Sequence, residues 1–141
     1  MDQTVPQVGS KACVLLADQG IGNAGLVSHL LYSEFQVVGT VYDGQAAVTA
    51  TLALKPDVLL IDIILPRLHG LDVIRRLVAL GVKSKMIVLT AVEDPEYVDE
   101  ALKAGASGYV FKRRITSDLP MAVREALGGG IFVSPTRLGN C

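Results

Sequence analysis

Short apolar runs alternate with longer amphipathic stretches over most of the chain, from about residue 11 to residue 127. The runs are rich in leucine and β-branched residues, and their length suits strands that are buried on both faces of a parallel sheet. They lie at 13–17, 37–42, 57–61, 86–90 and 108–111. The stretches between and after these runs predict helices at about 23–34, 44–54, 70–80, 95–104 and 117–127.

Local signals mark the ends of several predicted helices. Asp94 followed by Pro95 gives the fourth helix an N-cap and a first-turn proline. Pro56 stops the second helix, and Gly81 and Gly105 close two others. These signals support the boundaries that the apolar pattern predicts.

The strict alternation of five strands and five helices determines the fold that we expect. Parallel strands are joined by right-handed crossovers, which place helices on both faces of the sheet. We therefore predict an α/β, flavodoxin-like three-layer sandwich with a five-stranded parallel sheet and five helices. Residues 1–10 are predicted to form a flexible N-terminal tail, and residues 11–127 a single domain.

Polar residues follow four of the predicted strands at the point where each strand ends. These residues are Asp18, Asp62, Thr90 and Lys112. In open parallel sheets, ligands bind beyond the carboxyl ends of the strands, so we expect the four side chains to converge there. Two carboxylates, a hydroxyl and an ammonium suit phosphoryl chemistry, in which an Asp carboxylate can act as the nucleophile.

Four segments match a known family in their order and spacing. They read VLLAD (14–18), PDVLLIDIILPRLHGLDVIRRL (56–77), MIVLTA (86–91) and GASGYVFK (105–112). The chain resembles response-regulator receiver domains, the CheY-like family of bacterial two-component signalling. The resemblance covers about residues 11–127 and implies the CheY-like form of the predicted fold. Pro66 and Gly70 match the turn that follows the family's phosphoacceptor.

The resemblance implies a role for each polar residue. Asp62 is then the phosphoacceptor and receives a phosphoryl group from a sensor histidine kinase. The domain is then a switch, not an enzyme with a released substrate. Thr90 and Lys112 are the paired switch residues that contact the phosphoryl group, and Tyr109 occupies the aromatic rotamer-switch position.

The family holds Mg²⁺ with an acidic pair after the first strand, and this chain departs from that pair. Asp18 keeps the first acid, whereas Gln19 replaces the second. The implied Mg²⁺ ligands are Asp18, Asp62, the backbone carbonyl of Ile64 and, without charge, Gln19. Because Mg²⁺ favours carboxylate ligands, we expect weakened metal binding. Gln19 also leaves an alternative open: an atypical receiver that acts as a phosphorylation-independent interaction or dimerisation module.

The segment ALGGGIFVSP at 126–135 carries a second resemblance, to the end of receivers in the NarL/FixJ (LuxR-type) subfamily. It implies a transcription regulator that forms a homodimer on activation. We predict that residues 128–141 begin a linker to a C-terminal helix-turn-helix domain that this sequence does not contain. DNA binding would belong to that domain alone.

Composition narrows the function classes further. Apolar residues make up 50% of the chain and charged residues 19%, which excludes a disordered chain. A formal net charge of −1 provides no basic field for nucleic acid. No apolar run reaches the roughly 18 residues of a membrane span, and residues 1–10 lack a signal-peptide pattern. Cys13 and Cys141 make no disulfide framework, so we expect a cytoplasmic protein without membrane contact.

A competing interpretation starts from GIGNAG at 20–25, which matches the dinucleotide-binding pattern G-x-G-x-x-G. Asp43, at the end of the next strand, would then bind the ribose. In that pattern the first glycine follows the strand directly, whereas two residues intervene here. This interpretation also leaves Asp62 and Lys112 without a role. A nucleotide-binding enzyme domain is therefore our third hypothesis, after the phosphoacceptor switch and the interaction module.

Overall fold

The computed structural model describes residues 11–20 and 23–136, which form one parallel sheet with helices on both faces. The strands stand in the order β2-β1-β3-β4-β5-β6, and every neighbouring pair is parallel. Their bounds are β1 (Ala12–Ala17), β2 (Phe35–Val41), β3 (Val58–Ile61), β4 (Lys85–Thr90), β5 (Gly108–Phe111) and β6 (Phe132–Val133). The predicted parallel α/β fold is confirmed.

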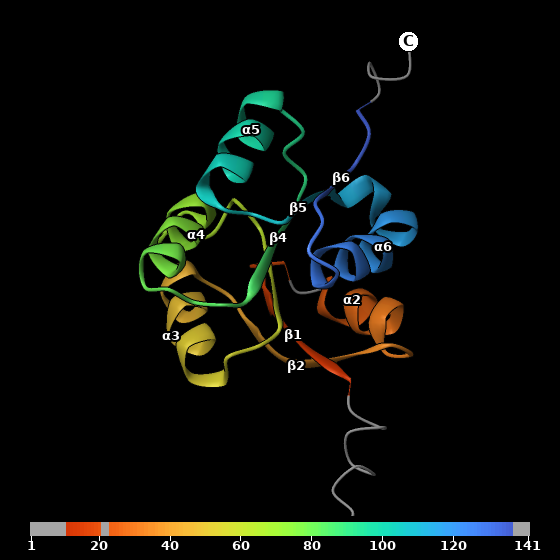
Figure 1. Cartoon of the computed structure of the whole chain (residues 1–141), viewed down its shortest axis with the longest axis horizontal. Coiled ribbons are helices and arrows are strands. Elements are labelled where there is room, and N and C mark those ends of the chain that lie inside the picture. Colours follow the sequence, from red (N-terminus) through yellow and green to blue (C-terminus); the bar gives the residue numbers. More distant parts are fainter. Residues whose placement is uncertain (1–10, 21–22, 137–141) are drawn as a thin grey trace, which may run out of the picture.

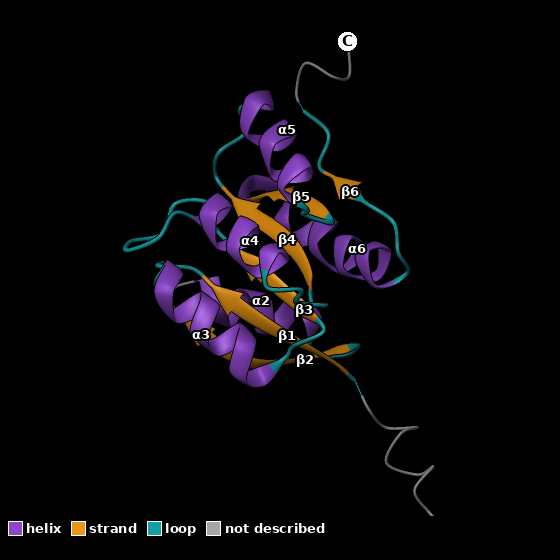
Figure 2. Ribbon diagram, turned by 60° about the vertical axis from the view of Figure 1, so that its left-hand side comes forward, coloured by secondary structure: helices purple, strands orange, loops and turns teal. Residues whose placement is uncertain are grey.

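Five α-helices cover the sheet within the described part of the chain. They are α2 (Asn23–Leu31), α3 (Gly44–Leu54), α4 (Gly70–Ala79), α5 (Pro95–Ala104) and α6 (Ile115–Leu127). A short 3-10 helix, η1 (Lys112–Arg114), joins β5 to α6. Figure 1 shows α3, α4 and α5 on one side of the sheet and α2 and α6 on the other. Figure 2 shows the same three layers with the strands between the helices.

The predicted strand count is wrong by one, because the sheet contains a sixth strand. β6 pairs with β5 in parallel, with Phe132 opposite Gly108 and Val133 opposite Tyr109. It falls in the segment that we predicted as the start of a linker. Two residues among glycines are too short to show the apolar run that identified the other strands. Pairing with β5, and not the local sequence pattern, therefore makes residues 132–133 a strand.

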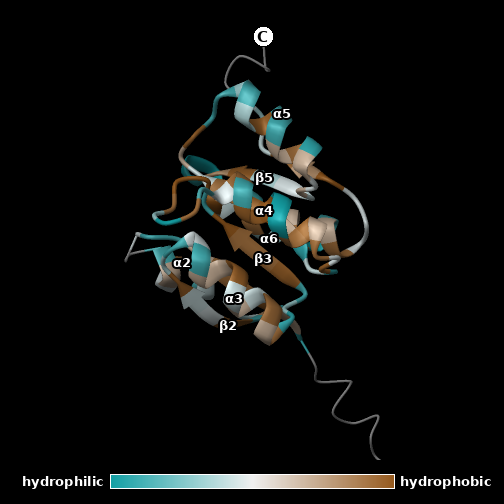
Figure 3. Ribbon diagram, turned by 90° about the vertical axis from the view of Figure 1, so that its left-hand side faces the viewer, coloured by the Kyte–Doolittle hydropathy of each residue, from teal (hydrophilic) through white to brown (hydrophobic). Residues whose placement is uncertain are grey.

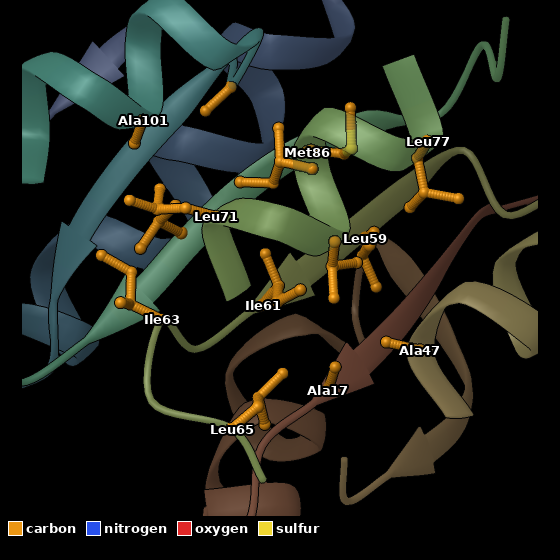
Figure 4. Packing of buried hydrophobic residues seen from close by; sticks show 14 of the residues in the cluster. Ala17, Ala47, Leu59, Ile61, Ile63, Leu65, Leu71, Leu77, Met86 and Ala101 are labelled. Carbon is orange, nitrogen blue, oxygen red and sulfur yellow. The ribbon is translucent and has the colours of Figure 1, made fainter. Parts of the chain in front are cut away.

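Alternate residues of the central strands enter two separate hydrophobic clusters. Leu15 and Leu59 pack in the cluster under α3, α4 and α5, part of which Figure 4 shows. Leu16 and Leu60, their direct neighbours in sequence, pack in the cluster under α2 and α6. All four side chains are at most 1% exposed. Burial on both faces explains why these strands read as continuous apolar runs in the sequence.

Side chains cap several helices where the chain enters them. The Oδ1 atoms of Asp43 and Asp94 accept hydrogen bonds from the backbone N–H groups of Ala46 (2.7 Å) and Glu96 (2.9 Å). These caps begin α3 and α5, and the cap of α5 is the one that the sequence predicted. Gly105, with φ of 121°, ends α5 in a conformation that a side chain would disfavour.

The hydropathy of the helices follows their position on the sheet. Figure 3 shows hydrophobic colour on the central strands and hydrophilic colour along the outward side of α5.

Within the described residues, no helix combines the length and the apolar character that crossing a membrane requires.

Candidate functional site

The carboxyl ends of β1, β3, β4 and β5 bring four polar side chains together. Asp18 and Asp62 directly follow β1 and β3, which are in register with Ala17 opposite Ile61. Thr90 ends β4, and Lys112 directly follows β5. The predicted convergence at this end of the sheet is confirmed by direct contacts among the four side chains.

Both carboxylate oxygens of Asp62 have hydrogen-bond donors. The Thr90 hydroxyl donates to Oδ1 at 2.6 Å, and the Ile64 backbone N–H donates to the same oxygen at 3.0 Å. The Lys112 ammonium donates to Oδ2 at 2.7 Å. Asp62 is 6% exposed, so these bonds replace most of the water that a free carboxylate would bind. The carboxylate is therefore fixed in orientation.

Asp18 is held just as firmly and is 1% exposed. Its Oδ1 accepts from the backbone N–H of Gly20 at 2.7 Å. Its Oδ2 accepts from the Lys112 ammonium at 2.9 Å and from the Asn23 side-chain amide at 3.2 Å. Sequence reasoning missed Asn23, because an Asn at a helix start looks like an ordinary capping residue. Here its amide orients a buried carboxylate of the site.

Lys112 is one cation between two buried carboxylates. Burial alone would lower the pKa of its ammonium, but the hydrogen bonds and charges of Asp62 and Asp18 outweigh burial and raise the pKa above its usual value. The ammonium therefore stays charged, and the three groups together carry a net charge of −1. A site with this excess of negative charge attracts a further cation.

The residues that remain available fit a Mg²⁺ ion only in part. Mg²⁺ is usually held by one or two carboxylates together with water and phosphate oxygens, and Asp18 and Asp62 supply two carboxylates. Gln19 is exposed beside Asp18 and offers an uncharged oxygen. Nowhere among the described residues do three His, Cys, Asp or Glu side chains gather as a metal cluster. The described residues thus supply two carboxylates, and a divalent ion there would take its remaining ligands from water or phosphate oxygens.

Tyr109 is fully buried and lies away from the solvent-facing side of the domain. Its hydroxyl donates to the backbone carbonyl of Val92 at 2.7 Å, and its ring meets Phe111 edge-on at 5.8 Å between centroids. Burial, aided by the nearby negative charge of Asp62, raises the pKa of the phenol above its usual value. Thr90, whose hydroxyl bonds Asp62, is fully buried as well. The side chains of Thr90 and Tyr109 therefore both lie in the interior.

Two glycines at helix starts, Gly44 and Gly70, hydrogen-bond the loop that follows Asp62. The N–H of Gly70 donates to the Ile63 carbonyl at 2.8 Å, and the N–H of Gly44 donates to the Pro66 carbonyl at 3.0 Å. A Cβ atom at Gly70 would strike the backbone of Asp62 and Ile63, and one at Gly44 would strike Leu68. The absence of a side chain at both positions lets α3 and α4 begin close to the site.

Part of the site region lies outside the described residues. The glycine-rich pattern at 20–25 includes residues 21–22, so its structure is not described as a whole. Asp43, which the competing interpretation assigned to a ribose, caps α3 and lies 3.6 Å from the guanidinium of Arg67.

Comparison with known proteins agrees with this geometry. Residues 14–124 match the family described as the response regulator receiver domain. The chain is 39% identical over 105 residues to the uncharacterized transcriptional regulatory protein YvfU of Bacillus subtilis, covering 74% of this chain and 52% of that protein. It is 37% identical over 102 residues to the transcriptional regulatory protein DegU of Brevibacillus brevis, covering 72% and 43%. The chain therefore spans about half the length of these relatives.

Solved structures show the same fold. The signal receiver domain of the putative response regulator NarL from Mycobacterium tuberculosis superposes with a TM-score of 0.79 at 29% identity, covering 85% of this chain and 98% of that one. The family match spans residues 14–124, which include Asp18, Asp62, Thr90 and Lys112, and the relatives are NarL- and LuxR-type regulators of two-component systems. The chain belongs to the response regulator receiver domain family.

Proposed function

We propose that this domain is a phosphorylation switch in which Asp62 accepts a phosphoryl group from the phosphohistidine of a sensor kinase. The observation that carries the proposal is the Asp62 carboxylate itself, which is buried and held by Thr90 and Lys112 at the carboxyl end of the sheet. An Asp oxygen attacks phosphorus, a P–O bond forms, and the N–P bond of the kinase histidine breaks. The electron pair of that bond stays on the imidazole, which then takes up a proton.

The residues around Asp62 position the reactants and stabilise charge. Lys112 and Thr90 now bond the two Asp62 oxygens, so each is one short movement from an oxygen of the incoming phosphoryl group. Charge-assisted bonds of this kind are roughly twice as strong as neutral ones. Asp18 holds Lys112 from the opposite side and keeps its ammonium aimed at the reaction centre.

Mg²⁺ would be held by the carboxylates of Asp18 and Asp62, the Ile64 backbone carbonyl and the side chain of Gln19. When bound, the ion neutralises negative charge on the phosphoryl oxygens. Because Gln19 adds no charge, the protein relies on Asp18 and Asp62 for attraction to the ion. We infer that Mg²⁺ binds more weakly here than in a site with three carboxylates.

The downstream events follow from the switch residues. Movement of Thr90 toward the phosphoryl group is accommodated beside the buried ring of Tyr109. The faces of α5, β5 and α6 near that ring would then adjust and favour a homodimer. By analogy with transcriptional regulators of about twice this length, DNA binding would be carried out by a following domain, in the cytoplasm.

Intact-protein mass spectrometry after incubation with acetyl phosphate tests the proposal. The wild-type chain should gain one phosphoryl group, and Asp62→Asn should gain none. Asp43→Asn is the matched control, since Asp43 also follows a strand but caps α3 outside the site. Repeating the incubation with and without Mg²⁺ shows the metal dependence. No adduct on the folded wild-type protein would contradict the proposal.

A second candidate function is a phosphorylation-independent interaction module. One observation favours it: Gln19, exposed beside Asp18, supplies no charge where the family has a second acid. Mg²⁺ and the phosphoryl group that it helps to hold would then be bound less firmly, and a domain of this kind could act through its surface alone. Size measurement before and after acetyl phosphate treatment separates the two. A dimer that forms equally well in Asp62→Asn supports the module.

A further inference from the structure

The chain does not leave the sheet at the end of α6 but returns along β5. After Leu127, the N–H of Gly130 donates to the Glu125 carbonyl at 2.9 Å, and Gly129 adopts a φ of 92°. β6 then runs parallel to β5 (Figures 1 and 2). We call residues 131–136 the C-terminal strap. Because β6 is parallel to β5, the strap carries the chain back toward the end of the sheet that holds Asp62.

The strap is bonded to β5 through backbone groups and one serine. The Ser107 carbonyl accepts from the N–H of Phe132 at 3.3 Å, and the Tyr109 carbonyl accepts from the N–H of Ser134 at 2.9 Å. The N–H of Phe111 donates to the Ser134 hydroxyl oxygen at 3.1 Å. Ser134 is only 1% exposed, so its hydroxyl continues the ladder where the strand itself stops.

A buried carboxylate anchors that hydroxyl. Ser134 donates to Oδ2 of Asp118, at 2.7 Å. Asp118 is 3% exposed and also accepts two bonds from the Arg114 guanidinium, at 2.9 and 3.3 Å, and one from Ser117, at 2.9 Å. Burial alone would raise the pKa of Asp118, but these bonds outweigh it and hold the pKa below its usual value. The anchor is therefore ionic and fully hydrogen-bonded.

The strap and the candidate site share one short piece of backbone. Ser134 bonds the backbone of Tyr109 and of Phe111, and Phe111 directly precedes Lys112. Arg114, which holds Asp118, lies two residues beyond Lys112 in η1. The segment 109–114 thus bonds the phosphoacceptor through the Lys112 side chain and the strap through its backbone, and its Arg114 side chain holds Asp118, the anchor of the strap.

We propose that the C-terminal strap is a coupled element of the switch: its docking on β5 through Ser134 and Asp118 and the occupancy of the Asp62 site by a phosphoryl group stabilise each other. This inference rests on the proposed function. A phosphoryl group strengthens the hold on Lys112 and so reduces the freedom of segment 109–114. A strap that binds an already ordered segment loses less entropy on docking.

Coupling of this kind is reciprocal, which gives two independent measurements. Phosphorylation should slow amide hydrogen exchange at Phe132 and Ser134, by about fivefold or more for a typical coupling. Conversely, loosening the strap should weaken binding of a phosphoryl mimic by the same factor. Beryllofluoride with Mg²⁺ is the suitable probe, because it binds reversibly and gives an equilibrium constant.

The experiment uses the full chain and two matched variants. Ser134→Ala removes the hydroxyl that joins Phe111 to Asp118. Ser117→Ala removes a hydroxyl that bonds Asp118 and the Arg114 carbonyl but contacts neither β5 nor the strap. Exchange is measured with and without acetyl phosphate, with Asp62→Asn as the unphosphorylated reference. Beryllofluoride affinity is measured for the folded wild type, Ser134→Ala and Ser117→Ala. We expect Ser134→Ala to lose affinity and Ser117→Ala to keep it.

Each outcome distinguishes the inference from the proposed function. A phosphoryl adduct on Asp62 with unchanged exchange in the strap, and equal beryllofluoride affinity in Ser134→Ala and Ser117→Ala, overturns the coupling and leaves the switch intact. No adduct and no beryllofluoride binding overturns the proposed function, and the coupling with it. If Ser134→Ala fails to fold, Asp118→Asn serves in its place, because it keeps the serine and weakens only the anchor.

Discussion

Two buried carboxylate networks flank segment 109–114, and they differ in charge balance. At the carboxyl end of the sheet, Asp18 and Asp62 share the single cation Lys112, which leaves a net charge of −1. At the start of α6, Asp118 is paired one-to-one with Arg114 and is completed by two serine hydroxyls. The first network has one formal negative charge in excess, whereas the charges of the second balance within the protein.

Under the proposed function, this difference separates a reactive arrangement from a structural one. Leaving a buried charge without a full partner costs stability, and such sites are common where a ligand binds. The Asp118 network carries no such cost, since its carboxylate is paired with Arg114 and accepts bonds from two serine hydroxyls. It orients a segment and has no unpaired charge to offer a ligand. Four predictions use substitutions to break or sharpen this contrast.

Removing the shared cation should have the largest effect. Lys112→Met leaves two buried carboxylates without a cation, and we expect it to destabilise the metal-free protein by about 3–5 kcal/mol. Chemical denaturation with and without Mg²⁺ measures this, and Mg²⁺ should restore part of the loss. Because the folded pKa of Lys112 is raised, its contribution is present below the unfolded value near 10.5 and disappears as pH rises through the folded value. Equal stability of variant and wild type at pH 7 would contradict the prediction.

Neutralising the balanced network should cost less. Asp118→Asn keeps the shape but weakens the bonds from Arg114 and Ser134, and we expect a loss of about 1–3 kcal/mol at pH 7, without any Mg²⁺ dependence. The folded pKa of Asp118 is lowered, so its contribution is full above the unfolded value near 3.8 and is lost as pH falls through the folded value. Urea midpoints of the two proteins should therefore converge in acid. A gap that widens in acid would show that the sign is wrong.

Restoring the missing acid should make the first network more unbalanced. Gln19→Asp adds a carboxylate beside Asp18, and we expect Mg²⁺ affinity to rise on the order of tenfold, about 1.4 kcal/mol. Titration followed by tyrosine fluorescence or backbone amide shifts measures it. Asp43→Asn, outside the site, is the control and should leave the affinity unchanged. If Gln19→Asp binds Mg²⁺ no better, Gln19 does not face the ion.

Removing an exposed ion pair should give the smallest change in stability of the four substitutions. Arg75 lies 3.4 Å from Glu100 across α4 and α5, and both side chains are about half exposed. Glu100→Gln should change stability by less than about 0.5 kcal/mol, because water and salt screen such pairs. Thermal unfolding in low and high salt checks this. A larger effect would indicate that surface charge, and not burial, governs the energetics of both networks.

The sequence predicted the site better than the network beside it. Asp18, Asp62, Thr90 and Lys112 each follow an apolar run, so a topological rule was enough to place them together, and their contacts confirm it. The roles assigned to them stay predictions. The residues that hold Asp18 in place, such as Asn23, depend on side-chain geometry that no periodicity contains.

The Asp118–Ser134 network was missed for a different reason. An acid in the first turn of α6 looks like a solvent-exposed residue favoured by the helix dipole. Ser134 stands in a glycine- and proline-rich stretch typical of linkers. Neither residue signals burial alone, and each becomes buried only because β6 packs beside β5. Long-range pairing of a two-residue strand leaves no trace in a local pattern.

The strap also has a consequence for the solubility of the domain. β5 is a fully buried, apolar strand (GYVF), and without β6 the carbonyls of Ser107 and Tyr109 and the N–H of Phe111 would be unpaired along its side. An open apolar strand of this kind is a template for pairing with another chain and for aggregation. Two residues of strand and one serine hydroxyl are enough to cover it. A protein shortened before residue 131 would therefore be expected to self-associate through β5 and to precipitate, even with every residue of the candidate site in place.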